Sequence, residues 1–314
     1  MTGARHVSHP AVFNFNAYSP PEIQALIETV GVKKATLPAL PCFMLALVAG
    51  GSIGFGALYY CIVASDADLS FAITRVMGGM VFSLGLAIVM ISGAELFTGN
   101  NLIVMAWASG TVSTVAVLRN WLIVYIGNFV GAAGLAVMVV LSHHLDMNGG
   151  RVGLTVLTTA AAKISPDVVT LFVKGVLCNL LVCLGVWLAY AGRSVTDKIA
   201  ALVLPISAFV AAGFEHSVAN MYFLSVAWLL TALGQTPQGF DASTITVAGI
   251  IYNLIPVTLG NIVGGSGFVG LVYWAIYQKG LAADSTAVSG ERSAAAAEHL
   301  NDDLQHSVIS RRQR

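Results

Sequence analysis

The chain has 314 residues; 57% of them are hydrophobic, 10% are charged, and the mean hydropathy is +0.81. Soluble domains carry about 25% charged residues, so this composition excludes an ordinary soluble protein and indicates an integral membrane protein. The formal net charge is zero, which gives no electrostatic reason to expect a nucleic-acid partner.

Residues 1–36 precede the first long apolar stretch and are predicted to form a cytoplasmic N-terminal segment. Within them, Ser19-Pro20-Pro21-Glu22 has the spacing of a helix capping box. Apolar residues then recur at helical spacing, at Ile23, Leu26, Ile27 and Val30. We therefore expect a short amphipathic helix that either docks beneath the membrane domain or lies on the membrane surface.

Six stretches are long and apolar enough to span a bilayer, which requires about 20 residues. They cover residues 38–63, 73–107, 117–141, 167–191, 199–231 and 246–277. The second and the fifth are too long, and too polar in the middle, for one uninterrupted helix. We predict that both are broken, that residues 37–280 form one transmembrane domain, and that residues 281–314 are a disordered cytoplasmic tail.

The two broken stretches share a motif, which indicates that the chain is duplicated. Gly93-x-Glu95 with Asn100 recurs 120 residues later as Gly213-x-Glu215 with Asn220. Gly127-Asn128 with Gly131 recurs 133 residues later as Gly260-Asn261 with Gly264. The repeats cover about 37–142 and 166–278, and the second is inverted because each contains three spans. The prediction is an all-α membrane protein with a 3+3 inverted repeat, and matching breaks in such repeats indicate a transport site between the halves.

Basic residues predict the orientation. With the N-terminus inside, the inner segments hold six of them: Lys33, Lys34, Arg119, Arg193, Lys198 and Lys279. The outer segments hold three: Arg75, Arg151 and Lys163. This excess places both termini in the cytoplasm.

Glu95 and Glu215 occupy equivalent places in the two breaks. Charged groups at bilayer depth are costly, so their presence needs a reason. They either form the charged wall of a transport path or have a structural part, and we favour the structural one. Each carboxylate would then accept hydrogen bonds from backbone N–H groups freed by its own break, because irregular backbone at depth must be satisfied internally.

His216 lies in the second break, between the repeats. It is either an interior histidine bonded to a neighbour or part of a transport path, and its position favours the path. A histidine titrates near neutral pH and can lend a proton to a passing weak-acid anion. Thr98, in the first break, has a hydroxyl that can donate to or accept from His216 or a substrate.

Five other polar residues have two interpretations each. Asn128, Asn179 and Asn261 either bridge helices or line a path. Lys163, in a predicted outer loop, is either simply solvated or attracts anions electrostatically. Lys174, about two turns into the fourth span, either snorkels outward or pairs at a subunit interface.

Phe82 and Leu86 are four residues apart and share a helix face, which makes them candidates for an apolar constriction. The chain has no nucleotide-binding loop, so ATP-driven transport has no support. Its histidine pair, His143-His144, lacks clustered metal ligands. We therefore expect neither an enzyme nor a cofactor.

Four segments together resemble the formate–nitrite transporter family. Residues 90–99 (Met-Ile-Ser-Gly-Ala-Glu-Leu-Phe-Thr-Gly) look like its first signature, and residues 175–184 look like its second, with Gly185 where the family usually has alanine. Residues 213–221 match its histidine motif, and residues 253–265 are close to the last span of its formate-channel branch. The resemblance covers roughly residues 18–279.

The resemblance implies an aquaporin-like six-helix protomer in a homopentamer, with one pore per protomer for small monovalent anions. By position it makes His216 the central pore histidine, places Thr98 on the loop that interrupts the second span, and places Lys163 in the vestibule. It makes Asn179 and Asn261 pore-lining residues. It also implies two apolar constrictions, a cytoplasmic one at Leu86 and Leu96 and an outer one at Phe82, Phe97, Val182 and Phe209.

From the resemblance we predict a pH-sensitive formate channel in the lipid of the cell inner (plasma) membrane. Two alternatives are a nitrite or hydrosulfide channel of the same family and a proton-coupled monocarboxylate carrier. A membrane-embedded redox subunit is a third class, which haem absorbance would reveal.

Overall fold

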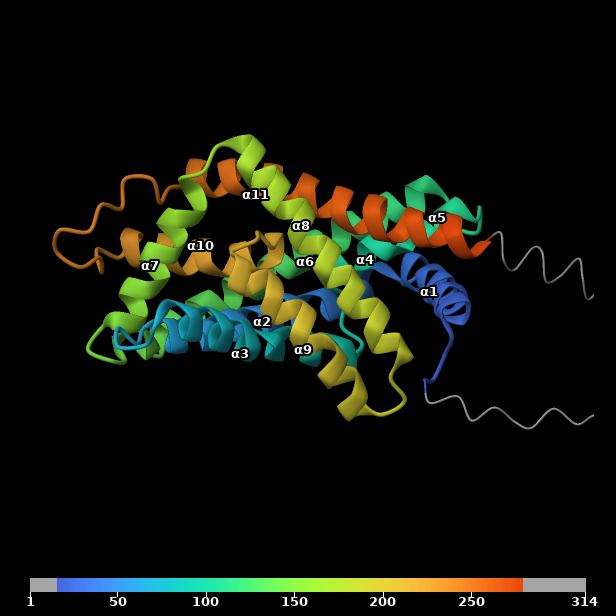
Figure 1. Ribbon diagram of the computed structural model, residues 1–314. Helices are drawn as coiled ribbons and strands as arrows, with labels where there is room; N and C mark the ends of the chain where they lie inside the picture. The colour runs from blue at the N-terminus through green and yellow to red at the C-terminus, as the bar shows by residue number, and fades with distance from the viewer. Residues whose placement is uncertain (1–15, 279–314) are drawn as a thin grey trace, which may run out of the picture.

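The computed structural model describes residues 16–278, and the secondary-structure elements in this part of the chain are all helices (Figure 1). Six helical stretches are long and apolar enough to cross a membrane: α2 (Ala39–Ala64), α3 (Phe71–Ser92), α6 (Thr114–Leu141), α8 (Val168–Ala191), α9 (Val195–Ala212) and Val247–Gln278. The last contains α11 (Val247–Ile262) and the π-helical η3 (Val263–Leu271). The six predicted spans are confirmed, and the tail predicted to be disordered lies outside the described residues.

The remaining elements are short: α1 (Pro20–Ala35), α4 (Phe97–Asn100), η1 (Asn101–Ile103), α5 (Val104–Ala108), η2 (His144–Asp146), α7 (Arg151–Ile164) and α10 (Ser217–Ala232). Both predicted breaks are present. Helix α3 ends at Gly93 with φ 70°, and α9 ends at Gly213 with φ 75°. Glycine is the residue that adopts this left-handed cap without a steric penalty. After each cap the chain stays non-helical for a few residues and then enters α4 or α10.

The two halves are inverted relative to each other, as predicted. In Figure 1, α1 and α7 lie at opposite ends of the bundle, and α2 and α8 start from those opposite ends. Helix α2 packs against α3 and α6, and α8 packs in the same way against α9 and α11.

Helix α1 docks on the membrane domain, which decides between the two predicted placements. Its capping box is present, and the backbone N–H of Ser19 donates to the Glu22 carboxylate at 2.7 Å. This hydrogen bond holds the pKa of Glu22 below its usual value. Ile23 and Ile27 are buried in a cluster with Leu102 and Met105, next to α5.

Helix α7 corrects the prediction of a loop around Lys163. Residues Arg151–Ile164 form a helix with buried apolar residues at helical spacing, at Val152, Val156, Leu157, Ala160 and Ile164. A search for membrane-length stretches misses it because it has 14 residues. Lys34 lies in the last turn of α1, and Lys163 lies in the last turn of α7. The two lysines are 129 residues apart, so α7 is the repeat equivalent of α1.

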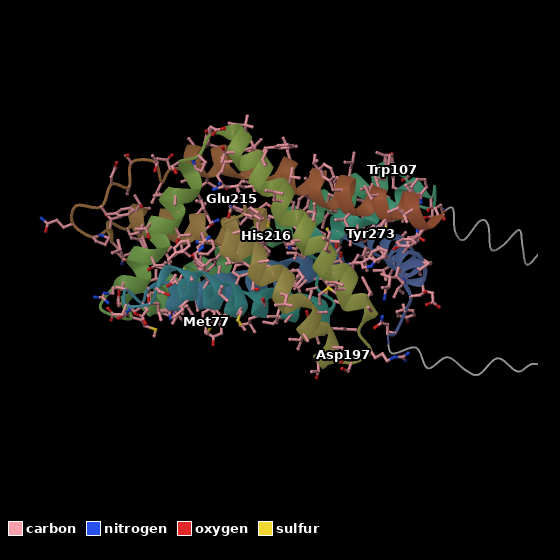
Figure 2. All side chains as sticks on the ribbon, viewed as in Figure 1. Met77, Trp107, Asp197, Glu215, His216 and Tyr273 are labelled. Carbon is pink, nitrogen blue, oxygen red and sulfur yellow. The ribbon has the colours of Figure 1, made fainter. Side chains whose placement is uncertain are left out.

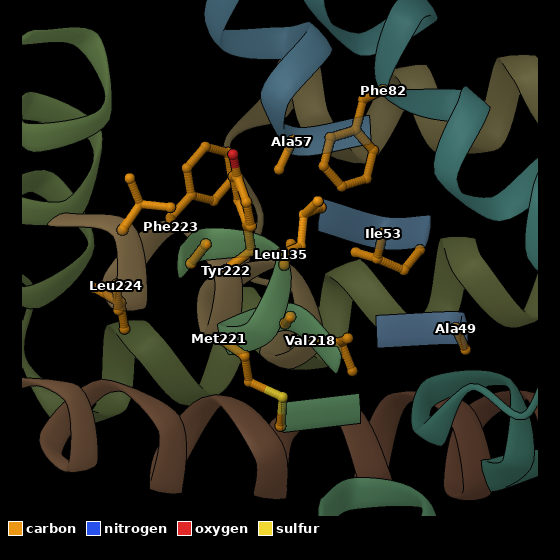
Figure 3. Close-up of a cluster of buried hydrophobic side chains, with 14 of the residues drawn as sticks. Ala49, Ile53, Ala57, Phe82, Leu135, Val218, Met221, Tyr222, Phe223 and Leu224 are labelled. Atoms are coloured by element: carbon orange, nitrogen blue, oxygen red, sulfur yellow. The ribbon is translucent and has the colours of Figure 1, made fainter. Parts of the chain in front are cut away.

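Helix α10 is the central element of the core. It has 16 residues, and most of them are buried among α2, α6, α7 and α11. Figure 3 shows Val218, Met221 and Tyr222 of α10 beside Ile53 of α2 and Leu135 of α6. This packing fixes the residue before α10, His216, in the middle of the bundle.

A substitution at Gly50 would test the tight contact between α2 and α6. A Cβ atom there would overlap the carbonyl oxygen of Asn128, which is backbone and cannot swing aside. We expect Gly50→Ala to destabilise the protein by about 1–3 kcal/mol, the usual cost of overpacking, and thermal unfolding in detergent would measure it. Gly51→Ala is the matched control, because its Cβ would meet the Gly131 oxygen at an ordinary 3.8 Å. Equal unfolding temperatures for the two variants would contradict this packing.

Candidate functional site

The two breaks meet at one hydrogen bond in the centre of the molecule. Thr98 Oγ1 lies 3.0 Å from His216 Nε2, and the two residues are 0% and 2% exposed. Thr98 comes from the first break and His216 from the second, so the pair joins the repeats. Figure 2 shows His216 and Glu215 in the middle of the helical bundle.

The hydrogen bonds of His216 determine where its ring carries a proton. Its Nδ1 accepts from the backbone N–H of Ala219 at 3.1 Å and so caps α10. A neutral ring with Nδ1 as acceptor carries its proton on Nε2 and donates it to Thr98 Oγ1. A second proton on Nδ1 would break the cap. The arrangement therefore favours a neutral histidine that presents a hydrogen-bond donor.

A cavity lies against His216, on the side of α7. We call it the α7-side cavity; its volume is about 460 Å³. Its lining includes His216, Phe82 and Phe209, and its charged residues are Arg75, Lys163, Lys174 and Glu215. The Phe209 ring stacks on His216 at 5.8 Å and meets the Phe82 ring edge-on at 5.7 Å.

A smaller cavity of about 50 Å³ lies toward α1, and we call it the α1-side cavity. Leu86 and Leu96 line it together with Lys34. Two other predicted constriction residues line neither cavity: Phe97 packs its ring 5.0 Å from that of Tyr125, and Val182 is buried in the core. Their place in a constriction stays a prediction.

Lys163 and Glu215 form an ion pair, which corrects two predictions. Lys163 Nζ lies 3.0 Å from Glu215 Oε2, and the side chains are 14% and 5% exposed. Asn220 Nδ2 donates to the same oxygen at 2.6 Å. Lys163 is therefore neither in a loop nor simply solvated. The carboxylate accepts from side chains, where hydrogen bonds from the backbone of its break had been expected.

The first half contains the same cluster. Lys34 Nζ lies 2.7 Å from Glu95 Oε1, and Asn100 Nδ2 donates to Glu95 Oε2 at 2.6 Å. Sequence reasoning missed Lys34, Asn100 and Asn220 as partners of the glutamates. The signal was present, because Asn100 and Asn220 follow their glutamates by five residues in both repeats.

Asn128 and Asn261 satisfy the backbone of the breaks. Asn128 Nδ2 donates to the Glu95 carbonyl at 2.9 Å, and its Oδ1 accepts from the Phe97 N–H at 2.9 Å. Asn261 does the same in the second half, at 3.0 Å to the Glu215 carbonyl and 2.9 Å from the Ser217 N–H. Both predicted helix-bridging roles fit these contacts. A direct pore-lining role for Asn261 stays a prediction.

Asn179 connects the site to α11. Its Nδ2 lies 2.7 Å from the Asn261 carbonyl, 2.9 Å from Asn101 Oδ1 and 3.2 Å from the Thr98 carbonyl. It therefore fixes the Thr98 backbone beside His216. Its role as a pore-lining residue stays a prediction.

Comparing the two halves separates the residues that both contain from those that only one contains. The lysines, the glutamates and the paired asparagines occur in both halves. The residues equivalent to Thr98, His216 and Asn179 are Val218, Leu96 and Gly50. The polar centre is thus built from residues that the other half lacks. Within residues 16–278, no three His, Cys, Asp or Glu residues gather as a metal site would require.

The Lys163–Glu215 pair yields a stability prediction. Removing one partner of a buried ion pair costs about 3–5 kcal/mol, and the partial exposure of Lys163 puts Lys163→Met at or below the low end. The double variant Lys163→Met/Glu215→Gln leaves no unpaired charge, so unfolding in detergent should show a smaller loss. Lys33→Met, at an exposed position, is the control. A double variant as unstable as the single one would contradict the pairing.

Three comparisons place the chain among known proteins. The formate/nitrite transporter family model matches residues 21–275. The formate channel FocA of Escherichia coli (strain K12) is 41% identical over 274 residues, which cover 84% of this chain and 95% of that protein. A probable formate transporter of Methanothermobacter thermautotrophicus is 36% identical over 278 residues, covering 83% and 97%.

Two solved structures have the same fold. One, described as a pentameric formate channel with formate bound, has a TM-score of 0.71 and 39% identity and covers 76% of this chain and 98% of that one. The other, an ion channel of the FNT family, has a TM-score of 0.72 and 30% identity, with 81% and 98% covered. Matched along most of its length by the family model and by its relatives, the chain belongs to the formate/nitrite transporter family.

Proposed function

We propose that this protein is a formate channel, which conducts small monovalent anions and catalyses no reaction. The observation that carries the proposal is the Thr98–His216 hydrogen bond, buried between two cavities that each contain a lysine. The substrate follows from relatives that are named formate channels. By the same reasoning the protein forms a homopentamer in the cell inner membrane, surrounded by lipid and with both termini in the cytoplasm.

The path runs from one cavity to the other through the buried pair. Phe82 and Phe209 narrow it beside His216, and Leu86 and Leu96 narrow it on the α1 side. A hydrated ion would have to shed its water at these apolar rings and side chains, which is costly without replacement hydrogen bonds. Selection for a small anion with few water molecules to lose follows from this barrier.

His216 and Thr98 replace the water that the anion loses. The neutral ring presents Nε2–H toward Thr98 Oγ1, and the threonine hydroxyl adds a second donor. An anion that enters between them accepts one or both hydrogen bonds. In acid, the ring lends a proton as well, at the expense of the cap to Ala219, and the anion then crosses neutralised. This step makes conduction pH-sensitive.

Purified protein in proteoliposomes tests the substrate. We expect counterflow of formate to exceed that of nitrite, hydrosulfide, lactate and chloride. Faster nitrite or hydrosulfide counterflow would favour the alternative function, a nitrite or hydrosulfide channel. Electrical conductance should persist without a proton gradient; a strict proton-coupled carrier would give none.

Variants of the central pair test the mechanism. Thr98→Val keeps the shape of the side chain and removes its hydroxyl, so formate flux should fall by about tenfold, the equivalent of one lost hydrogen bond. Thr98→Ser, which keeps the hydroxyl, is the control. Wild-type flux in Thr98→Val would remove this hydroxyl from the path.

His216→Asn separates the hydrogen bond from the proton. An asparagine can cap α10 and donate a hydrogen bond, but it cannot gain a proton. Formate flux at neutral pH should therefore persist in this variant, while the increase in wild-type flux on acidification should vanish. A variant that keeps the wild-type pH response would overturn the proton step.

A further inference from the structure

Lys174 is a charged residue of the α7-side cavity to which the proposed mechanism gives no part. It lies on α8, and its side chain is half-buried. Its backbone carbonyl accepts from the N–H of Glu215 at 3.2 Å, which places it beside the second break. Snorkelling to lipid and pairing at a subunit interface stay predictions, and within the protomer the side chain lines this cavity.

The other charged groups of the cavity are bound to protein acceptors or donors. Arg75 Nε and Nη2 donate to the carbonyl oxygens of Ala211 and Val210 at 2.7 and 3.1 Å, at the C-terminal end of α9. They thereby neutralise the negative end of that helix. Lys163 is held by Glu215 at 3.0 Å.

The ammonium group of Lys174, by contrast, makes no hydrogen bond or ion pair with any residue between 16 and 278. The cavity thus contains three cationic side chains and one carboxylate. Of the three cations, Lys174 is the one whose charged group has no hydrogen-bond or ion-pair partner among the described residues.

The direction of the side chain suits a role at the mouth of the path. Side chains on an α-helix lean toward its N-terminus, and α8 begins beside α7. Lys174 therefore leans away from His216 and toward the end of the bundle where α7 lies.

The repeat equivalent of Lys174 is apolar. Leu45 lies 129 residues earlier, and its carbonyl accepts from the Glu95 N–H at 3.3 Å just as that of Lys174 accepts from Glu215. Leu45 lines neither cavity. The scaffold therefore needs a backbone carbonyl at this place in both halves and does not need a lysine. The charge is an addition in the second half alone.

We propose that Lys174 is the anion-capturing residue of the α7-side cavity, where it holds a small monovalent carboxylate before the anion passes to His216. Lys163 shapes the positive potential but is restrained by its ion pair. Lys174, whose ammonium group has no partner between residues 16 and 278, makes the direct contact. A single cation in a water-accessible cavity binds weakly, which a conduction path requires, since the anion must leave as well as enter. The inference rests on the proposed anion-channel function.

Flux kinetics test the assignment. In proteoliposomes at low ionic strength, Lys174→Gln should raise the formate concentration for half-maximal uptake by about three- to tenfold, the loss of one nearby unit charge. The maximal flux should stay near that of the wild type. The difference should shrink at about 0.3 M salt, because exposed charges are then screened within a few ångströms. Lys174→Arg keeps the charge and should resemble the wild type, and Lys33→Gln is the control for a cation outside both cavities.

A second variant makes the test independent of folding. The four native cysteines are buried, so Lys174→Cys introduces an accessible thiol into the cavity. Modification by an aminoethyl methanethiosulfonate restores a cation on the same folded sample and should lower the half-saturating formate concentration. The sulfonatoethyl reagent adds an anion and should raise it.

Half-saturation unchanged by Lys174→Gln and by both reagents would overturn the assignment. If the wild type conducts nitrite and no formate, the formate proposal fails, and the same comparison with nitrite still decides the role of Lys174. Conduction of neither anion by the wild type would overturn both proposals.

Discussion

The fold depends on one constraint: irregular backbone in the middle of a bilayer must find its hydrogen-bond partners inside the protein. Both broken helices meet it in the same way. Asn128 and Asn261 each accept from the N–H of the helix that follows the break and donate to the carbonyl of the glutamate within it. Without these amides, each break would expose unpaired backbone to an apolar core. Opening a helix at this depth, which a transport path needs, is possible because the scaffold supplies the partners.

The two glutamates belong to the same scaffold, in which their charges are paired with lysines. Each is neutralised by a lysine from the short helix that precedes its half, α1 or α7, and each accepts from an asparagine one turn beyond the break. The short helices are therefore integral to the repeat, because they bring the cation that allows a carboxylate at this depth. The lysines, glutamates and asparagines of the scaffold occur in both halves. The residues of the polar centre do not, so they can differ between the halves without loss of the scaffold.

The sequence predicted the parts of this architecture that follow a long-range pattern. Six spans, two breaks and the duplication follow from apolar length and from motifs that recur at fixed offsets. A contact between Thr98 and His216 could be suggested from the sequence, because both residues lie in the predicted helix breaks. Helix α7 and the Lys34–Glu95 and Lys163–Glu215 pairs were not predicted. Helix α7 is too short to appear in a search for membrane spans. The pairs were missed because a side chain near the end of a helix gives no sign in the sequence of where it points.

Asymmetry in an otherwise duplicated scaffold makes the two ends of the proposed path chemically different. The second half supplies a histidine where the first has Leu96, and a lysine where the first has Leu45. Both additions line the α7-side cavity, whereas the α1-side cavity is smaller and carries Lys34 in an ion pair. On the proposed path, an anion on the α7 side would meet a cation that has no partner among the described residues and, in the same cavity, a hydrogen-bond donor. From the α1 side it would meet Lys34, already held in an ion pair, and then the leucines. Both sides therefore contain an apolar barrier, and among the described residues the α7 side alone contains an unpaired cation.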